Sequence, residues 1–439
     1  MTTNFAASVF QNEYLPAGAT SVDAIITVSS GELGAAGGAN ATAQPVGGRV
    51  EVIVIDTSGS MMGDNGAKIE AARQATMAAI NVLADGTEFA VVMGNHEARM
   101  LYPYQGLAVA DDRTREAACD AVARVRADGG TAIGSWLLAA AALFSLSPGG
   151  VAHCTLLTDG KNEHEKPWQL DQAIAASVGK FQCDARGLGT DWEVDELRKV
   201  ANALLGTVDI VPSPDELEAE FRALTMASMS KQIGSVALRL WSPKGSQLGF
   251  VKQVSPNLED LSDKGDVVSP LITDYPLGAW GPGEERDYHL RIDIPVGNVG
   301  QERLAARVML VVDGQEQPAA LVKAVWTDDE VLSTRINGEV AHYTGQAELA
   351  DAIAEGLAAR QAGDHDTATV RLGRAVQLAH EAGNDDTVKL LAKVVEVEDP
   401  ETGTVRLRRS VEQADAMALD VRSTRTVRVN RRREPGASS

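Results

Sequence analysis

The chain has 439 residues, 44% of them hydrophobic, and a formal net charge of −21 at neutral pH. This length predicts about two to four domains with apolar cores, and the acidic balance argues against a nucleic-acid partner. The opening MTTNFAASVF lacks a basic segment followed by an apolar one, and the longest apolar run, Trp136–Phe144, is too short to cross a bilayer. We therefore expect a cytoplasmic protein that does not contact a membrane.

The N-terminal segment has the composition of β-strands. Residues 6–15 and 22–29 alternate loosely and are rich in Val, Ile and Thr, which favours two strands. Residues 31–48 are rich in Gly and Ala and are typical of a linker. We predict that residues 1–47 contribute strands to a β-sandwich, followed by this linker, and that the other strands of the sandwich lie further along the chain.

Residues 48–230 alternate between strand and helix patterns, which predicts a doubly wound, mostly parallel α/β sheet. Short apolar runs predict strands at residues 50–55, 88–93, 152–157, 180–188 and 208–211. Helical spacing predicts helices at residues 68–83, 113–126, 132–144, 170–178, 193–204 and 214–228. His153 lies on one of these strands, and we interpret it as a core residue with satisfied hydrogen bonds.

Five polar residues lie at the ends of these strands or in glycine-marked loops, namely Asp56, Ser58, Ser60, Thr131 and Asp159. Loops at the carboxyl ends of parallel strands converge on one crevice, so these side chains can meet although they are distant in the chain. Two carboxylates and three hydroxyls are oxygen ligands that suit Mg²⁺, Mn²⁺ or Ca²⁺ rather than Zn²⁺. The simpler alternative is that Asp56 and Ser58 only cap a helix.

The order Asp-x-Ser-x-Ser, Thr, Asp resembles the metal-ion-dependent adhesion site of the von Willebrand factor A (VWA) domain, over about residues 48–228. The resemblance is to VWA proteins of the bacterial cytoplasmic type. It implies a Rossmann-like fold and a divalent cation, Mg²⁺ first, held by Asp56, Ser58, Ser60, Thr131 and Asp159. It also implies that an Asp or Glu of a protein partner completes the metal shell.

Residues 231–330 change to short alternating runs separated by Pro and Gly, which predicts an antiparallel β-sandwich. Together with the N-terminal strands, this makes the VWA domain an insertion in the sandwich. Residues 340–400 carry apolar residues at helical spacing and resemble a tetratricopeptide-like helical hairpin, but one or two hairpins do not make a solenoid. For this helical segment, a packing role and a peptide-binding role both stay open.

Residues 401–439 form a basic tail. Residues 406–439 contain nine Arg and four Asp or Glu, a net charge of +5, which leaves −26 for the rest of the chain. We expect the tail to be disordered, either solvated or resting on the acidic body. Thr424 and Thr426 each have a Val three positions on, which resembles a ligand of forkhead-associated domains. The resemblance implies that a Ser/Thr kinase phosphorylates Thr424 or Thr426 and that a forkhead-associated-domain protein docks there.

These features predict a non-enzymatic protein that binds an acidic residue of a partner through its metal ion, in a regulatory or assembly role. One alternative is a scaffold whose metal is structural and whose tail is the phosphothreonine ligand. Another is a metal-dependent hydrolase, because a bound cation activates water. No nucleophile with its general base is identifiable in the sequence, which favours the non-enzymatic interpretation.

Overall fold

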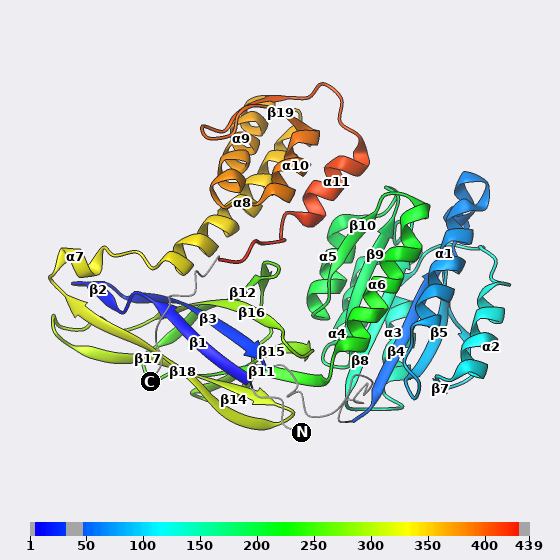
Figure 1. Cartoon of the computed structure of the whole chain (residues 1–439), viewed down its shortest axis with the longest axis horizontal. Coiled ribbons are helices and arrows are strands. Elements are labelled where there is room, and N and C mark those ends of the chain that lie inside the picture. The colour runs from blue at the N-terminus through cyan, green and yellow to red at the C-terminus, as the bar shows by residue number, and fades with distance from the viewer. Residues whose placement is uncertain (1–4, 32–46, 430–439) are drawn as a thin grey trace.

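The computed structural model describes residues 5–31 and 47–429, which form three adjoining parts (Figure 1). A β-sandwich contains the N-terminal strands together with residues 233–327. An α/β part lies between these two segments in the sequence, and a helical part follows them. Within the described ranges, no helix is both long enough and apolar enough to cross a membrane.

The α/β part is built on a seven-stranded sheet. Its strands are β4 (Arg49–Asp56), β5 (Glu88–Gly94), β6 (Ala98–Tyr102), β7 (Ala108–Val109), β8 (Val151–Thr158), β9 (Gln182–Leu188) and β10 (Val208–Val211). The strand order is β10-β9-β8-β4-β5-β6, with β7 also pairing with β5. The pairs from β10 to β5 are parallel, whereas β6 and β7 pair antiparallel with β5. This confirms the predicted doubly wound, mostly parallel sheet.

Helices cover both faces of this sheet. They are α1 (Gly63–Asn81), α2 (Asp112–Val122), α3 (Ile133–Phe144), α4 (Pro167–Ser177), α5 (Val194–Ala203) and α6 (Leu217–Ser230). The central strand β4 is buried along its whole length and alternates its side chains between two cores. Val52 and Val54 pack with α3, α4 and α5, whereas Ile53 and Ile55 pack with α1, α2 and α6. A strand buried on both faces explains the unbroken apolar run of residues 52–55.

The β-sandwich consists of two sheets that draw strands from both sides of the α/β part. Its strands are β1 (Phe5–Gln11), β2 (Tyr14–Pro16), β3 (Ser21–Ser30), β11 (Ile233–Trp241), β12 (Gln247–Ser255), β13 (Glu259–Asp260), β14 (Asp266–Ser269), β15 (Ile272–Trp280), β16 (Glu285–Asp293), β17 (Glu302–Val312) and β18 (Gln315–Thr327). One sheet has the order β1-β3-β16-β12-β13 and the other β14-β15-β11-β17-β18-β2. Strand β3 pairs antiparallel with β16 from Ser21 opposite Asp293 to Ser29 opposite Glu285. The α/β part is therefore an insertion in the sandwich, as predicted.

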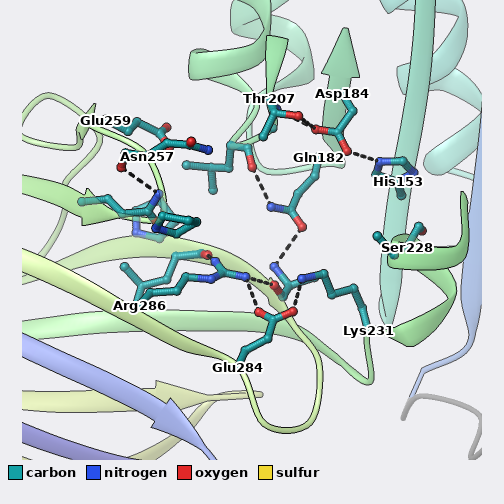
Figure 2. A pocket seen from close by; sticks show the side chains of 18 of the residues that line it. His153, Gln182, Asp184, Thr207, Ser228, Lys231, Asn257, Glu259, Glu284 and Arg286 are labelled. Carbon is teal, nitrogen blue, oxygen red and sulfur yellow. Dashed lines mark hydrogen bonds and ion pairs between the residues drawn. The ribbon is translucent and has the colours of Figure 1, made fainter. Parts of the chain in front are cut away.

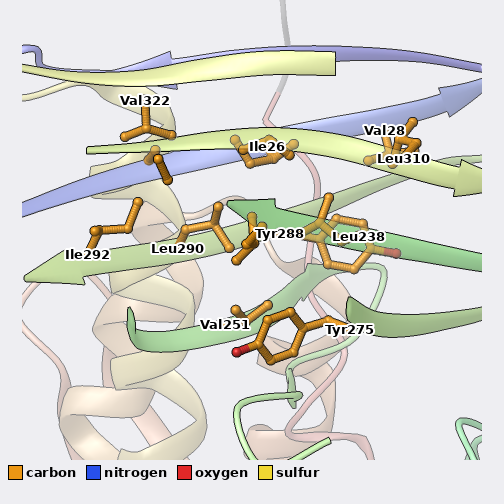
Figure 3. Packing of buried hydrophobic residues seen from close by; sticks show 14 of the residues in the cluster. Ile26, Val28, Leu238, Val251, Tyr275, Tyr288, Leu290, Ile292, Leu310 and Val322 are labelled. Carbon is orange, nitrogen blue, oxygen red and sulfur yellow. The ribbon is translucent and has the colours of Figure 1, made fainter. Parts of the chain in front are cut away.

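The N-terminal strand β3 contributes to two packed layers. Ile26 and Val28 point into the sandwich core, where Leu290 and Leu238 also lie (Figure 3). Ile25 points to the opposite face and packs with Tyr343 of the helical part. The β-strand period of two places neighbouring side chains on opposite faces, so one strand joins the sandwich to the helices.

If β3 is an integral strand of the sandwich, Ile26→Ala should destabilise a module most of whose other strands lie more than two hundred positions away. Ile26 is fully buried, so we expect the substitution to lower the free energy of unfolding by about 2–5 kcal/mol, measured by urea denaturation. The control is Val267→Ala on β14, where the side chain is 76% exposed and the expected change is within about 0.5 kcal/mol. Equal effects of the two substitutions would contradict the packing described for β3.

The helical part contains α7 (Glu330–Ser333), α8 (Gly338–Gln361), α9 (His365–Glu381), α10 (Asp385–Val394) and α11 (Gln413–Arg422), with a hairpin of β19 (Val395–Asp399) and β20 (Thr404–Leu407). Helices α8 and α9 form a closely packed pair. An added Cβ at Gly356 would lie 2.7 Å from Cγ of Leu372, so the glycine permits this close approach. The core of this part includes Leu349, Ile353 and Leu372.

The expectation that residues 401–439 are disordered is wrong for residues 401–429. These residues form β20, then α11, then an extended segment along the sandwich (Figure 1). Ala418 and Val421 of α11 pack in a core of the α/β part, whereas Leu419 packs in the core of the helical part. The tail was expected to be either solvated or resting on the acidic body, but apolar residues between the arginines give this segment a buried face. Residues 430–439 lie outside the described residues.

The extended segment after α11 fastens the C-terminal residues to a buried carboxylate of the sandwich. Asp287 on β16 is fully buried and accepts hydrogen bonds from Thr27 Oγ1 and Tyr343 Oη, each at 2.5 Å. The guanidinium of Arg428 donates to both oxygens of Asp287, at 3.1 and 3.2 Å. A buried carboxylate requires such donors and a compensating charge. Asp287 therefore ties strand β3, helix α8 and the C-terminal segment to one point.

Replacing Arg428 with Met should leave the buried Asp287 without its cation. Hydrogen bonds to charged groups contribute about 1.5–3 kcal/mol, and we expect Arg428→Met to lower the free energy of unfolding by that amount. The matched control is Arg406→Met, which removes the exposed pair between Arg406 and Glu398 and should change stability by less than about 1 kcal/mol. Urea denaturation measures both, and limited proteolysis should cleave the C-terminal segment faster in Arg428→Met.

Candidate metal centre

The five polar residues singled out in the sequence lie at the carboxyl edge of the α/β sheet. Asp56 ends β4, and Asp159 follows the last residue of the neighbouring parallel strand β8. Ser58 and Ser60 lie in the turn between β4 and α1, which includes the short helix η1 (Gly59–Met62). Thr131 lies two residues before α3. Three loops from different parts of the chain thus meet at one edge, as the strand order requires.

Hydrogen bonds link four of the five residues. Ser58 Oγ and Ser60 Oγ are 2.8 Å apart, and Ser60 Oγ donates to Asp159 Oδ1 at 2.6 Å. The backbone N–H of Ser58 donates to Asp56 Oδ1 at 2.7 Å. Two hydroxyls and two carboxylates are therefore arranged around a small volume at the sheet edge.

The loop that carries Thr131 is held against the other two. Gly59 N donates to Gly129 O at 2.8 Å. A Cβ added at Gly160 would lie 3.1 Å from Ser60 Oγ and 3.5 Å from Thr131 Oγ1, so the glycine leaves the space between these two hydroxyls open. His164 fixes the backbone of Thr131 through two hydrogen bonds. Nδ1 of its ring accepts from Thr131 N at 3.2 Å, and the backbone N–H of His164 donates to Thr131 O at 3.0 Å.

Asp56 lies in an environment that disfavours its negative charge. Burial is the largest cause and raises the pKa of the Asp56 carboxyl to about 6, although hydrogen bonds from Ser58 and Thr158 lower it in part. Thr158, which donates to Asp56 Oδ2 at 2.6 Å, was not predicted as a site residue. A cation at this edge would favour the ionised form of Asp56 and offset the penalty of burial.

A lysine that the sequence analysis did not consider also enters the centre. Lys68 Nζ on α1 donates to Asp159 Oδ2 at 2.8 Å, and Asp191 Oδ2 lies 3.5 Å from the same nitrogen. Burial lowers the pKa of Lys68, but the hydrogen bond and charge of Asp159 outweigh this effect, so its pKa is raised. The lysine is therefore an ammonium beside one of the candidate metal ligands.

The donor set fits a hard divalent cation. Among the residues that the structure describes, no group of three or more His, Cys, Asp or Glu side chains is placed to hold a metal ion, so a cation here depends on hydroxyl oxygens as well. Asp56, Ser58, Ser60, Thr131 and Asp159 provide only oxygen atoms, which are the ligands that Mg²⁺, Mn²⁺ and Ca²⁺ prefer.

The opposite edge of the sheet forms a polar joint with the sandwich (Figure 2). A cavity of about 390 Å³ lies there between the two parts. His153 on β8 contacts Glu51 Oε1 through Nδ1 at 2.7 Å and Asp184 Oδ2 through Nε2 at 3.0 Å. Gln182 bridges the two parts, because it donates to Leu205 O at 2.7 Å and accepts from Ala279 N at 3.0 Å.

The two carboxylates determine the charge of His153. Burial lowers the pKa of His153, but the charge and hydrogen bonds of Glu51 and Asp184 outweigh burial and raise it to about 10. The pKa of Asp184 is correspondingly held well below its ordinary value, although burial opposes this. His153 is thus a core residue with satisfied hydrogen bonds, as interpreted from the sequence, and it is also a buried cation.

Two family models match the chain. Residues 51–210 match the model for the von Willebrand factor type A domain, and residues 377–423 match that for the von Willebrand factor type A C-terminal domain. The second match begins near the end of α9 and extends through α11. With the similarity over nearly the whole chain described next, these matches show that the chain belongs to the von Willebrand factor type A family, as predicted.

Among individual proteins, the chain is similar to a von Willebrand factor type A protein from Catenulispora acidiphila, with 51% identity over 97% of this chain and 98% of that chain and a TM-score of 0.90. An uncharacterized protein of Synechocystis sp. is 30% identical over 48% of this chain. The matched region spans about half of that relative, 49% of its length. The ArnB paralog VWA2 from Sulfolobus acidocaldarius is 14% identical with a TM-score of 0.58, covering 97% of this chain and 98% of that chain, and shares the fold.

The buried imidazolium predicts a specific dependence of stability on pH. Since the pKa of His153 is raised in the folded state, its stabilising contribution is fully present below about pH 6.5 and is lost as pH rises toward 10. We expect His153→Gln to destabilise the protein most near pH 6, and the difference from the wild type to shrink toward pH 10. Thermal melts across this range measure it, with His380→Gln on the surface of α9 as the control. A pH-independent difference would contradict the assigned charge.

Proposed function

We propose that this protein is a non-enzymatic interaction module that binds a partner through a divalent cation, Mg²⁺ in the first place. The observation that carries the proposal is the convergence of Asp56, Ser58, Ser60 and Asp159 in one hydrogen-bonded group, with Thr131 Oγ1 and Ser60 Oγ both next to Gly160. When bound, the cation supplies an electrophilic position for an oxygen ligand. The five residues hold it, some of them through water.

The ligand set of the centre leaves a place for an acidic partner. Only two of the five candidate ligands are carboxylates, and one of them, Asp159, also pairs with Lys68. Neutral hydroxyl ligands do not reduce the charge of the cation, so an Asp or Glu side chain of a partner is the natural final ligand. Ser60 is exposed, whereas the other four candidate ligands are buried, so a partner would approach the centre from the side of Ser60, away from the joint with the sandwich. A regulatory or assembly role follows from binding without turnover.

The interpretation as a hydrolase has less support. A hydrolase needs a general base within hydrogen-bond reach of the attacking water. The histidine nearest to the candidate ligands, His164, uses Nδ1 to accept the N–H of Thr131. His164 therefore holds a loop in place, and this contact supports the interpretation as an interaction module.

Phosphorylation of the C-terminal segment stays a prediction, and the structure adds a condition to it. Thr426 Oγ1 donates to Val254 O at 2.7 Å, and the carbonyl of Thr424 accepts from Leu258 N at 2.7 Å. A kinase binds its substrate in an extended, accessible form, so the segment must leave the sandwich before Thr426 can be modified. The cytoplasmic location and a forkhead-associated-domain partner likewise stay predictions.

The metal assignment is tested by Asp56→Ala. We expect this substitution to weaken Mg²⁺ and Mn²⁺ binding by at least about tenfold, because it removes a ligand or the group that orients one, while circular dichroism stays unchanged. Isothermal titration calorimetry measures the affinities, and Asp112→Ala, a fully exposed carboxylate on α2, is the control. A partner recovered from native lysate should be lost both with EDTA and with Asp56→Ala. Binding of the partner that survives both treatments would favour a scaffold with a structural metal.

A further inference from the structure

Lys68 lies at the metal centre but is not one of the five candidate ligands. Its side chain is 11% exposed, and its ammonium is 2.8 Å from Oδ2 of Asp159, whose side chain is fully buried. The other oxygen of Asp159 accepts from Ser60. The two oxygens of Asp159 therefore contact different groups, because Oδ1 contacts the candidate ligand Ser60 and Oδ2 contacts Lys68.

Two glycines lie beside the side chain of Lys68. A Cβ added at Gly63 would be in ordinary contact with Cε of Lys68, at 3.6 Å, and one added at Gly189 would lie 3.9 Å from its Nζ. Gly189 has a φ of +70° and donates its N–H to Val211 O, a conformation in which a larger residue would be strained. The start of α1 and the turn after β9 therefore flank the lysine side chain.

A second carboxylate lies within reach of the same ammonium. Asp191 Oδ2 is 3.5 Å from Lys68 Nζ, and its side chain is 72% exposed. Asp191 follows β9 and lies outside the group formed by the five candidate ligands. A small rotation of the flexible lysine side chain would transfer the ammonium from Asp159 to Asp191 without changing any protonation state.

We propose that Lys68 is an internal counter-ion of the metal centre. Its ammonium pairs with Asp159 in the metal-free protein and moves to Asp191 when a divalent cation binds. This inference rests on the proposed function. Like charges repel at short range in a poorly solvated site, so the cation and the ammonium compete for Asp159. Lys68 thereby lowers the affinity for the metal, and Asp191 restores part of it by accepting the displaced ammonium.

The position of Asp191 connects this exchange to the C-terminal helix. Gln413, the first residue of α11, donates to the carbonyl of Thr190 at 3.2 Å. Trp192, which is buried, donates its Nε1–H to Gly189 O at 2.9 Å. The loop of residues 189–192 is therefore held by an internal hydrogen bond and also contacts the start of α11, next to Asp191.

The test is a titration of the full chain with Mn²⁺, followed by calorimetry, in four variants. Lys68→Met should bind Mn²⁺ about tenfold more tightly than the wild type, because the competing charge is absent. Asp191→Asn should bind several-fold more weakly, because the ammonium then has no second carboxylate. Lys68→Met combined with Asp191→Asn should behave like Lys68→Met alone, since the effect of Asp191 acts through the lysine. Lys161→Met, which removes the exposed pair with Glu193, should behave like the wild type.

A second readout does not depend on affinity. Without metal, Lys68→Met leaves Asp159 buried without its cation, so its melting temperature should be lower than that of the wild type and should rise more when Mn²⁺ is added. Equal affinities of the wild type and Lys68→Met would overturn the counter-ion while leaving the metal centre intact. If Asp191→Asn does not weaken binding, the exchange is wrong, even where Lys68→Met is too unstable to measure. If neither the wild type nor Lys68→Met binds Mn²⁺, the proposed function itself fails.

Discussion

The antiparallel pairing of β3 with β16 is the constraint on which the arrangement of the molecule depends. It joins residues 21–29 to residues 285–293, which lie on either side of the inserted VWA domain in the sequence, and so completes the sandwich. The domain leaves the sandwich after β3 and returns through α6 directly into β11. Arg49, at the start of β4, donates to Ser228 O at 3.0 Å near that return. Because both ends of the insert lie at one edge of its sheet, the metal centre at the other edge points away from the sandwich.

Two buried carboxylates join parts of the molecule. Asp287 joins the sandwich, α8 and the C-terminal segment, and Asp209 on β10 pairs with Arg422 and Arg425. Such contacts are specific in direction, since a displaced partner leaves a carboxylate buried and unpaired. Three of the C-terminal arginines, Arg422, Arg425 and Arg428, thereby neutralise particular buried carboxylates.

The sequence predicted the parts of this structure that follow from local pattern. The apolar run before Asp56 and the one before Asp159 defined two strands, and the rule that parallel strands end together placed both carboxylates at one edge. Lys68 and Thr158 could not be found in this way, because helical spacing does not show into which loop a lysine side chain extends. The order of residues 401–429 was missed for a related reason. The contact of Arg428 with Asp287 joins positions 141 apart, and composition alone treats each arginine as a solvated charge.

The interleaved strand order has a consequence for synthesis of the chain on the ribosome. Strand β3 is complete at Ser30 and pairs on one side with β1, which precedes it, but β16, which pairs with its other side, begins only at Glu285. At a translation rate of about 5–20 residues per second, the intervening residues take roughly 13–50 seconds to appear. The inserted domain has all of its strands by the end of that interval, whereas β1 and β3 still lack β16 and the facing sheet of the sandwich. Newly made chains therefore carry an N-terminal pair of strands with an uncovered apolar face that a chaperone can bind, and the sandwich closes after the inserted domain.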